Sequence, residues 1–418
     1  MERQNYLSYW SSLYKEDLTE NILPFWLRHM VDGEHGGFYG RMTGEGQLMP
    51  DAAKGAILNA RILWSFSAAY RVLGKAEYLQ AARRAKEYIL QHFADRTFGG
   101  TFWEVDCEGQ PSDTKKQFYA IGFMLYGLSE YARALHHRIG TSASAETETV
   151  LQECFSLFDV IERHARDHEH GGYIEALSRD WQPLADVRLS EVDANFPKSQ
   201  NTHLHIIEPY ANFFRCLKEM HRSTDRVEPA LRHLIDIFCH RILNASTWHL
   251  DLFFEMDWTR GAGHLESYGH DIECSWLLHE AALVLGDAGV LAQVEPIVQR
   301  VAEASVKGIN ADGSMTHEAN LDTGYVDADR HWWVQAEAVV GFLNIYQHFH
   351  TDAALERALR CWEYIKAHLI DRELGEWFWS CDAEGRVNRC EDHAGFWKCP
   401  YHNSRMCLEV IERFAKRA

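Results

Sequence analysis

One segment recurs six times along the chain, and this repeat constrains the fold more than any other feature. Each copy contains a glycine-rich turn, such as Gly-Gly or Asp-Gly, and continues with alternating aromatic and polar residues. Turn glycines followed by an alternation with a period of two are typical of a short β-hairpin. Similar segments that recur along a chain indicate a fold built from structural repeats. The copies begin at His35, Phe98, His170, His249, Asp312 and Leu374.

The segments between the copies have a helical pattern. Successive copies start roughly 60 to 80 residues apart, which is enough for two helices of ordinary length and their connections. Such helices cannot bury their apolar faces alone, so neighbouring helical hairpins must stack. Apolar residues recur at i, i+3, i+4 and i+7 in four stretches, namely Ala56–Tyr70, Ile272–Leu285, Val334–Tyr346 and Leu355–Leu369.

We predict that residues 1–418 form a single all-α domain, an (α/α)6 barrel of six helical hairpins with short β-hairpins at one end. An open superhelical solenoid is the alternative. Closure is favoured because the chain has no obvious polar capping repeats to cover the ends of a solenoid. The substrate site of such a barrel is expected at one mouth, where helix ends and turns converge. The Ser/Thr/Glu-rich stretch Thr141–Val150 is predicted to be a surface loop.

Charge and composition exclude several classes of protein. A net charge of −19 argues against nucleic acid and against an anionic membrane surface. The segment Met1–Trp10 lacks the apolar core of a signal peptide, and no apolar run approaches the length of a membrane span. Ten cysteines without a C-x-x-C pair indicate reduced, mostly buried thiols. We therefore expect a cytoplasmic protein, a monomer or weak homodimer, with no nucleic-acid or membrane partner.

Polar residues lie among large apolar residues in the segment NTHLHIIEPYANFF and in the segment YGHDIECSWLLHEA. In the first, Asn201, His205 and Glu208 share one helix face at i, i+4 and i+7, while His203 points elsewhere. In the second, a histidine and a glutamate share a face at i and i+3; they are His270 and Glu273.

A third segment, FWKCPYHNSRMCLEVI, and the stretch LNARILWSF carry further candidates. Pro400 suits the first turn of a helix, so it places His402 early in the final helix. Arg61 is the candidate in the other stretch. A lone histidine in a helix is more often a hydrogen-bonded core residue than a catalyst. Three such segments in one chain favour a shared functional site.

Histidine proton transfer is the chemistry that these residues support best. We find neither H-E-x-x-H nor a spacing typical of two histidines and one carboxylate, and we find no G-x-S-x-G and no P-loop. Histidine gives or takes a proton near neutral pH. Two histidines on opposite faces of a substrate carbon could remove a proton and restore one. Glu273 is expected to orient His270, and Arg61 to stabilise enolate charge.

Four motifs together resemble the signatures of the N-acylglucosamine 2-epimerase superfamily. They are Asn201-Thr-His-Leu-His205, Gly269-His-Asp-Ile-Glu273, Arg330-His-Trp-Trp-Val-Gln-Ala-Glu337 and Trp397-Lys-Cys-Pro-Tyr-His-Asn403. The resemblance implies an (α/α)6 barrel, a small-molecule sugar substrate and no metal or nicotinamide cofactor. It also implies interconversion of glucose and mannose configurations at carbon 2 of a reducing-end sugar, through ring opening and a cis-enediolate. The members that the chain resembles most act on β-1,4-linked disaccharides such as cellobiose, lactose and mannobiose.

The resemblance also implies roles for individual residues. His270 and His402 match the two acid/base histidines, and His205 matches the histidine of ring opening. Glu337, one helical turn beyond Trp333, is a weaker candidate. The residues that match the lining of the sugar pocket are Arg61, Tyr119, Asn201, Glu273, Trp333 and Trp397.

Two departures from the family pattern leave the substrate open. Gln200 stands where the family has Met, and Met315-Thr316-His317 stands where disaccharide enzymes offer an aromatic ring. A D-mannose 2-epimerase or an aldose–ketose isomerase on free monosaccharides would share the same catalytic residues. A glycoside hydrolase or lyase needs two flanking carboxylates, and no convincing acidic pair is found. A non-catalytic carbohydrate-binding scaffold fits the 14 tryptophans but leaves the embedded histidines unexplained.

Overall fold

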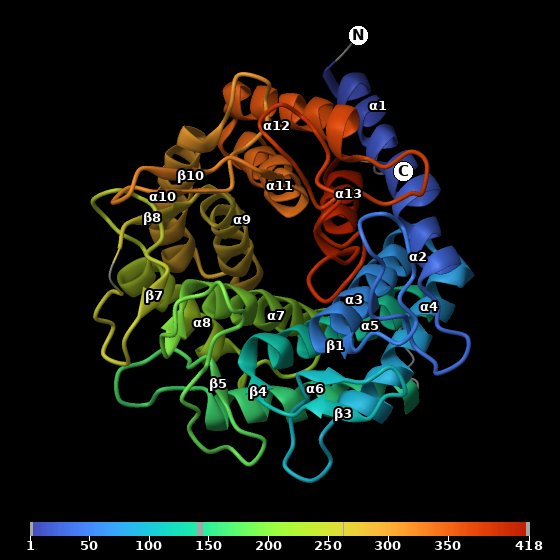
Figure 1. The fold of residues 1–418 in the computed structure, drawn as a ribbon. Helices are drawn as coiled ribbons and strands as arrows, with labels where there is room; N and C mark the ends of the chain where they lie inside the picture. The colour runs from blue at the N-terminus through green and yellow to red at the C-terminus, as the bar shows by residue number, and fades with distance from the viewer. Residues whose placement is uncertain (1–2, 140–144, 262, 415–418) are drawn as a thin grey trace.

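The helices form two concentric rings (Figure 1). The computed structural model describes residues 3–139, 145–261 and 263–414. Each inner helix contacts the next inner helix, and the last contacts the first, so the ring is closed and the barrel prediction is confirmed over the open solenoid. The inner helices are α3 (Ala56–Leu73), α5 (Phe118–Ile139), α7 (Gln200–Glu219), α9 (Tyr268–Leu285), α11 (Trp332–Phe349) and α13 (Tyr401–Phe414).

The outer ring is made by the second helix of each hairpin. Five outer helices pack on the inner helix that precedes them, and α1 packs on α13, so the first and last helices of the chain complete the sixth hairpin. The outer helices are α1 (Arg3–Glu16), α2 (Leu23–His29), α4 (Ala76–Tyr88), α6 (Ala145–His164), α8 (Glu228–Ile237), α10 (Ala288–Ser305) and α12 (Asp352–Tyr364). Short π-helical or 3-10 turns adjoin several of them: η1 (Asp17–Ile22), η2 (Ile89–Phe93), η3 (Phe238–Ile242), η4 (Val306–Gly308) and η5 (Ile365–Leu369).

Helix composition follows the two rings. In α9 the apolar residues surround the helix on all sides, as expected for a helix that is covered on both faces, whereas α8 and α12 keep theirs on one face. The four predicted helical stretches lie in α3, α9, α11 and α12 with η5. The loop predicted over Thr141–Val150 is wrong from Ala145 onward, where α6 begins with acidic residues in its first turn. Residues 141–144 lie outside the described part of the chain.

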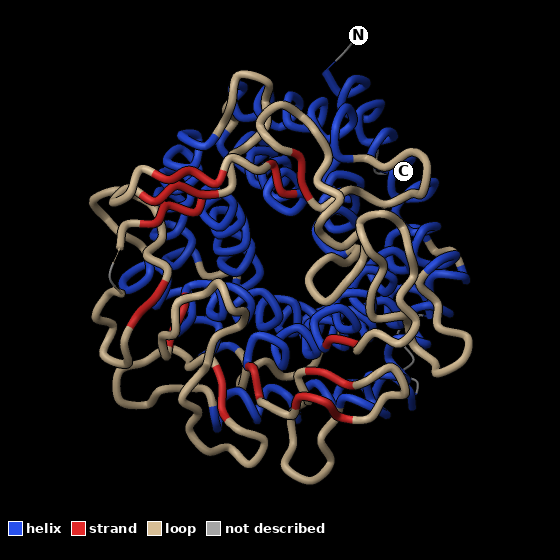
Figure 2. Tube along the Cα trace, viewed as in Figure 1, coloured by secondary structure: helices blue, strands red, loops and turns tan. Residues whose placement is uncertain are grey.

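The turn at the start of each sequence repeat is closed by an isolated β-bridge, and the repeats then pair with their neighbours. The turn bridges are Val31↔Phe38, Ala94↔Thr101, Arg166↔Tyr173, Leu243↔Leu250, Ile309↔Met315 and Ile370↔Trp377. Five short strands that precede inner helices pair with the following copy: β1 (Lys54–Gly55) with β2 (Glu104–Val105), β4 (Lys116–Gln117) with β5 (Ala176–Leu177), β6 (Lys198–Ser199) with β7 (Phe253–Phe254), β8 (Leu265–Ser267) with β9 (Glu318–Asn320), and β11 (Arg330–His331) with β12 (Ser380–Cys381). β3 (Pro111–Asp113) and β10 (Tyr325–Asp327) extend two of these sheets. The strands lie around one end of the ring (Figure 2), so the predicted β-hairpins are confirmed and also link neighbouring copies.

A buried ion pair fixes three of these turns to the strand that precedes the next inner helix. A lysine at the start of the strand donates to an aspartate of the turn and to a turn glycine carbonyl, while the same aspartate accepts backbone N–H groups of its own turn. Buried charges are tolerated only when they are paired in this way. The pairs are Lys54–Asp32 at 2.6 Å, Lys116–Asp95 at 2.9 Å and Lys198–Asp167 at 2.7 Å.

Two further expectations concern the chain as a whole. All ten cysteines are unpaired and seven of them are buried, as predicted for reduced core thiols. Within the described ranges, no helix combines the length and the unbroken apolar character that crossing a bilayer requires.

Candidate active site

Every inner helix begins at the end of the ring that carries the strands, and each contributes a predicted site residue from its first two turns. These residues are Arg61 of α3, Tyr119 of α5, Asn201 and His205 of α7, His270 and Glu273 of α9, Trp333 of α11 and His402 of α13. Trp397 lies just before α13. The N-terminus of a helix carries a partial positive charge. Six such termini around one space favour an anionic ligand or intermediate at its centre.

All nine predicted residues line one cavity of about 250 Å³. Sequence positions more than 300 residues apart are therefore brought together at one mouth of the ring. A second cavity of about 230 Å³ adjoins the first and shares Leu189, Asp193, Asn201, His270 and His317 with it. Lining residues of the first cavity that the sequence did not point to are Leu189, Ser190, Asp193 and Trp379, whereas His317, His331 and Trp332 lie in segments that the sequence singled out without giving them a role.

His402 is held by a carboxylate from the neighbouring inner helix. Its Nδ1 lies 2.6 Å from Oε1 of Glu337, which also accepts from the Arg405 guanidinium. A carboxylate that is held by an arginine accepts the Nδ1 proton of the ring and leaves Nε2 with a free lone pair. Burial, followed by the charges of Arg61 and Arg405, lowers the pKa of His402 well below its usual value. His402 is therefore a neutral ring with one basic nitrogen at neutral pH.

His270 has a different partner from the one predicted. Its Nδ1 lies 2.8 Å from Oγ of Ser267, whereas Glu273 accepts from Nη2 of Arg405 at 2.9 Å. The prediction that Glu273 orients His270 is wrong, because the buried guanidinium attracts the carboxylate away from the ring. Burial, and then the neighbouring histidines, lower the pKa of His270. The ring of Trp333 contacts both histidines, with its centroid 4.8 Å from that of His270 and 5.8 Å from that of His402.

Arg405 is the largest feature of the site that the sequence did not reveal. Its side chain is fully buried one turn after His402 on α13 and forms ion pairs with Glu208, Glu273 and Glu337. One cation thus faces three carboxylates. Burial, and then the charge of Glu337, raise the pKa of Glu273 well above its usual value. The guanidinium holds this cluster together beneath His402.

A kink in α7 positions His205. The residue has non-helical dihedral angles (φ −92°, ψ 15°), and Pro209 follows four positions later. Proline has no N–H to donate to the carbonyl of residue i−4 and its ring clashes there, so Pro209 accounts for the kink. Nδ1 of His205 lies 3.2 Å from Oε2 of Glu208, and burial lowers the pKa of His205 to about 4. The ring also packs edge-on against Tyr119, whose hydroxyl accepts from Arg61 at 2.9 Å.

The kink is accommodated by Gly122 of α5. A Cβ atom at this position would lie 2.5 Å from the carbonyl oxygen of His205. We expect Gly122→Ala to displace His205 and to lower kcat by about tenfold, because small displacements of catalytic groups are costly. Steady-state kinetics together with thermal melting test this. An alanine variant with normal kcat and higher stability, as its helix propensity alone would give, would contradict it.

Four buried polar atoms of residues that line the cavity have no hydrogen-bond partner among the described residues. They are Oε2 of Glu273, Oδ1 of Asn201, Nε of Arg61 and Nε1 of Trp332. Buried polar atoms are nearly always hydrogen-bonded in folded proteins. Two acceptors and two donors beside the cavity nevertheless make no hydrogen bond within the described part of the chain.

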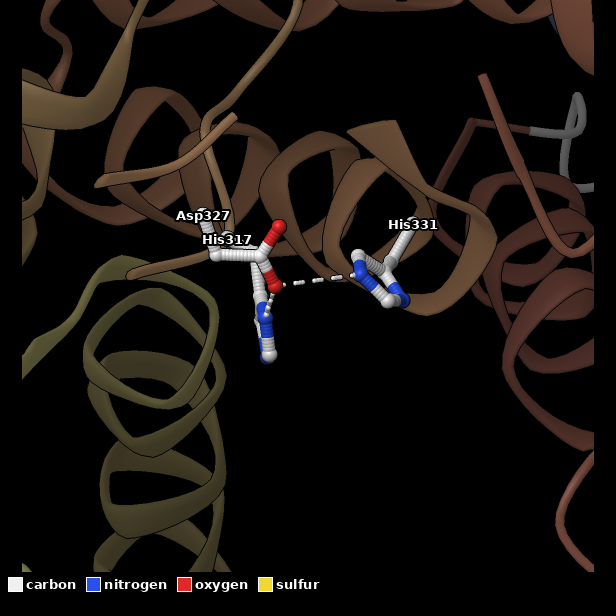
Figure 3. A group of neighbouring side chains, drawn as sticks. All are labelled: His317, Asp327 and His331. Carbon is white, nitrogen blue, oxygen red and sulfur yellow. Dashed lines mark hydrogen bonds and ion pairs between the residues drawn. The ribbon is translucent and has the colours of Figure 1, made fainter. Parts of the chain in front are cut away.

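Two groups of side chains in the described residues have the composition of a metal site. In the first, Glu273, Glu337 and His402, the Arg405 guanidinium already pairs with both carboxylates. The second is His317, Asp327 and His331, two histidines and one carboxylate (Figure 3). The sequence showed no spacing typical of such a group, because its members lie in or next to different strands; the β9–β10 pairing places Asp327 beside His317, and His331 lies in β11.

Comparison with known proteins identifies the family. Residues 37–404 match the family of N-acylglucosamine 2-epimerase (GlcNAc 2-epimerase), and the chain belongs to this family. A cellobiose 2-epimerase from Bacteroides fragilis is 53% identical over 397 residues, which are 95% of this chain and 97% of the relative. A cellobiose 2-epimerase from Ruminococcus albus is 38% identical over 400 residues, covering 96% and 97%. The solved structure of a cellobiose 2-epimerase from Bacillus thermoamylovorans superposes with a TM-score of 0.88 at 37% identity, covering 97% of this chain and 99% of that one.

Proposed function

We propose that this protein is a carbohydrate 2-epimerase, an isomerase that interconverts glucose and mannose configurations at carbon 2 of the reducing-end sugar of β-1,4-linked disaccharides. The observation that carries the proposal is the pair His270 and His402, which line one cavity and both contact Trp333, with Glu337 holding His402. Two relatives that are 53% and 38% identical over nearly the whole chain are cellobiose 2-epimerases. Cellobiose, lactose and mannobiose are the proposed substrates.

The proposed reaction begins with ring opening, in which His205 polarises the sugar. Nε2 of His402 then takes the proton from carbon 2, and the electrons of that C–H bond form a double bond between carbon 1 and carbon 2. The π electrons of the aldehyde move to its oxygen, which gives the cis-enediolate. Arg61 and the inner-helix N-termini stabilise its negative charge. Protonated His270 returns a proton to the opposite face of carbon 2, and the two histidines exchange roles in the reverse direction. The anionic intermediate beside His270 favours the protonated form of that ring.

The adjoining cavity supports a disaccharide over a free monosaccharide. It has about the volume of the first cavity and opens from it at Asn201, His270 and His317, so a second sugar ring has a space of its own. We also propose that the enzyme needs no cofactor, since histidines alone can move the proton. A cytoplasmic monomer or weak homodimer fits the acidic charge and the free thiols.

The lowered pKa of His402 predicts a shifted pH profile. Burial keeps this ring in its basic form below the usual histidine pKa of about 6.5, so protonation of the base sets in only when the pH falls further. We expect the acidic limb of kcat/KM to lie below pH ~6.5. Measuring kcat/KM across the acidic range tests this; a limb above that value would show that burial does not control the base.

Product analysis tests the proposed function. Incubation with cellobiose should give the disaccharide with mannose at its reducing end, and chromatography separates the two. Conversion of mannose but not of cellobiose would indicate the monosaccharide alternative, and a ketose product would indicate an aldose–ketose isomerase. Release of free glucose would indicate a hydrolase. Sugar binding without any product would indicate a binding protein.

A further inference from the structure

Two histidines and one aspartate meet at the edge of the candidate site. His317 directly precedes β9, Asp327 ends β10, and His331 ends β11 at the start of α11. The antiparallel register pairs Asp327 with Glu318, which places Asp327 beside His317. Oδ2 of Asp327 lies 2.7 Å from Nδ1 of His317 and 3.4 Å from Nε2 of His331. Figure 3 shows this carboxylate oxygen between the two rings.

The donor set and its spacing suit a divalent transition-metal ion. Imidazole nitrogen and carboxylate oxygen are the ligands that Zn²⁺ and its neighbours in the first row bind, at about 2.0–2.2 Å. Ligand atoms on one such ion are therefore about 3–4 Å apart, and the three atoms here all lie within 4.8 Å of one another. The side chains are 17–25% exposed, so an ion can reach them from solvent.

We propose that His317, Asp327 and His331 bind a divalent transition-metal ion of the Zn²⁺ class, and that the bound ion inhibits the enzyme. His317 and His331 line the same cavity as His270 and His402. An ion there fixes both rings and places its remaining water ligands at the edge of the cavity that the sugar has to enter. The proposal has two parts, metal binding (the binding half) and inhibition by the bound ion (the inhibition half). The first does not depend on the proposed function, whereas the second rests on it.

The chain supplies a matched control for the binding half. His264 and Asp322 form an exposed pair at 2.6 Å beside the same sheet. Among the described residues, this pair is not part of a group of three possible metal ligands. A single imidazole and a carboxylate form a much weaker site than two imidazoles and a carboxylate. His264→Gln should therefore leave metal binding unchanged.

Calorimetric titration of the metal-free protein with Zn²⁺, and the visible absorbance of added Co²⁺, test the binding half without any sugar. We expect one ion per chain, a loss of affinity of at least tenfold in Asp327→Asn and in His331→Gln, and no loss in His264→Gln. Thermal melting verifies that each variant is folded. The absence of binding by the parent, or equal affinity in Asp327→Asn, would overturn the site.

Kinetics with the parent enzyme test the inhibition half. Zn²⁺ should raise the apparent KM for cellobiose at least tenfold at saturation, EDTA should restore it, and Asp327→Asn should need more Zn²⁺ for the same effect. Unchanged KM at saturating metal would refute inhibition while leaving the site in place. A metal-free enzyme that converts no sugar, but still binds Zn²⁺ at this site, would instead refute the proposed function.

Discussion

Replacing His402 with alanine is expected to lower kcat by about 10²–10⁴-fold, the usual contribution of a general acid or base. Nε2 of His402 is the free nitrogen of a ring whose other nitrogen is held 2.6 Å from Glu337. Alanine removes the base and leaves the cavity shape otherwise intact. Stopped assays of cellobiose conversion measure the loss, and circular dichroism with thermal melting shows that the variant is folded.

His279→Ala is the matched control for this variant. His279 is fully buried on α9 and bonds to Asn344, but it does not line the cavity. Both substitutions remove a buried imidazole, so both should lower stability, and only His402→Ala should lower kcat. Retention of more than about one tenth of the activity in His402→Ala would remove this residue from the proposed proton transfer.

Replacing Arg405 with methionine is expected to lower the free energy of unfolding by about 3–5 kcal/mol, the usual cost of leaving a buried charge without its partner. The change leaves Glu208, Glu273 and Glu337 without their cation. Protonation would neutralise these carboxylates, so the loss should be smaller at acidic than at neutral pH. Urea unfolding at two pH values measures both effects.

Arg232→Met provides the surface comparison. Arg232 pairs with Glu228 and Asp287, and all three side chains are more than one-third exposed, so the loss should stay below about 1 kcal/mol. A comparably small change in Arg405→Met, independent of pH, would mean that the three carboxylates are stable without the guanidinium.

The sequence predicted the helical ring because every repeat carries the same local signals. The glycine turns and the helical periodicity are local properties, and six copies that cannot bury their faces alone must stack. The pairing of the sixth hairpin could not be predicted in this way, because its helices α1 and α13 come from opposite ends of the chain. Local patterns do not specify contacts between chain ends.

The sequence predicted the members of the site better than their partners. The nine residues predicted from the sequence all line the cavity, and His203 does point elsewhere, with Nδ1 2.6 Å from the carbonyl oxygen of Ser199. We predicted a contact between Glu273 and His270 because the two residues are neighbours on one helix face. In the structure, Glu337 of α11 instead bonds to His402 of α13. Arg405 lies in an amphipathic segment, where an arginine is ordinarily exposed, so the local sequence does not indicate that it is buried.

Hydrogen exchange at carbon 2 tests the central proposal most directly. In heavy water, nuclear magnetic resonance should show deuterium at carbon 2 of the reducing-end sugar of the epimerised product, because the histidine that protonates the enediolate exchanges its proton with solvent. The replacement should be close to one deuterium per molecule of product formed. Product that retains its original hydrogen at carbon 2 would contradict transfer through two histidines.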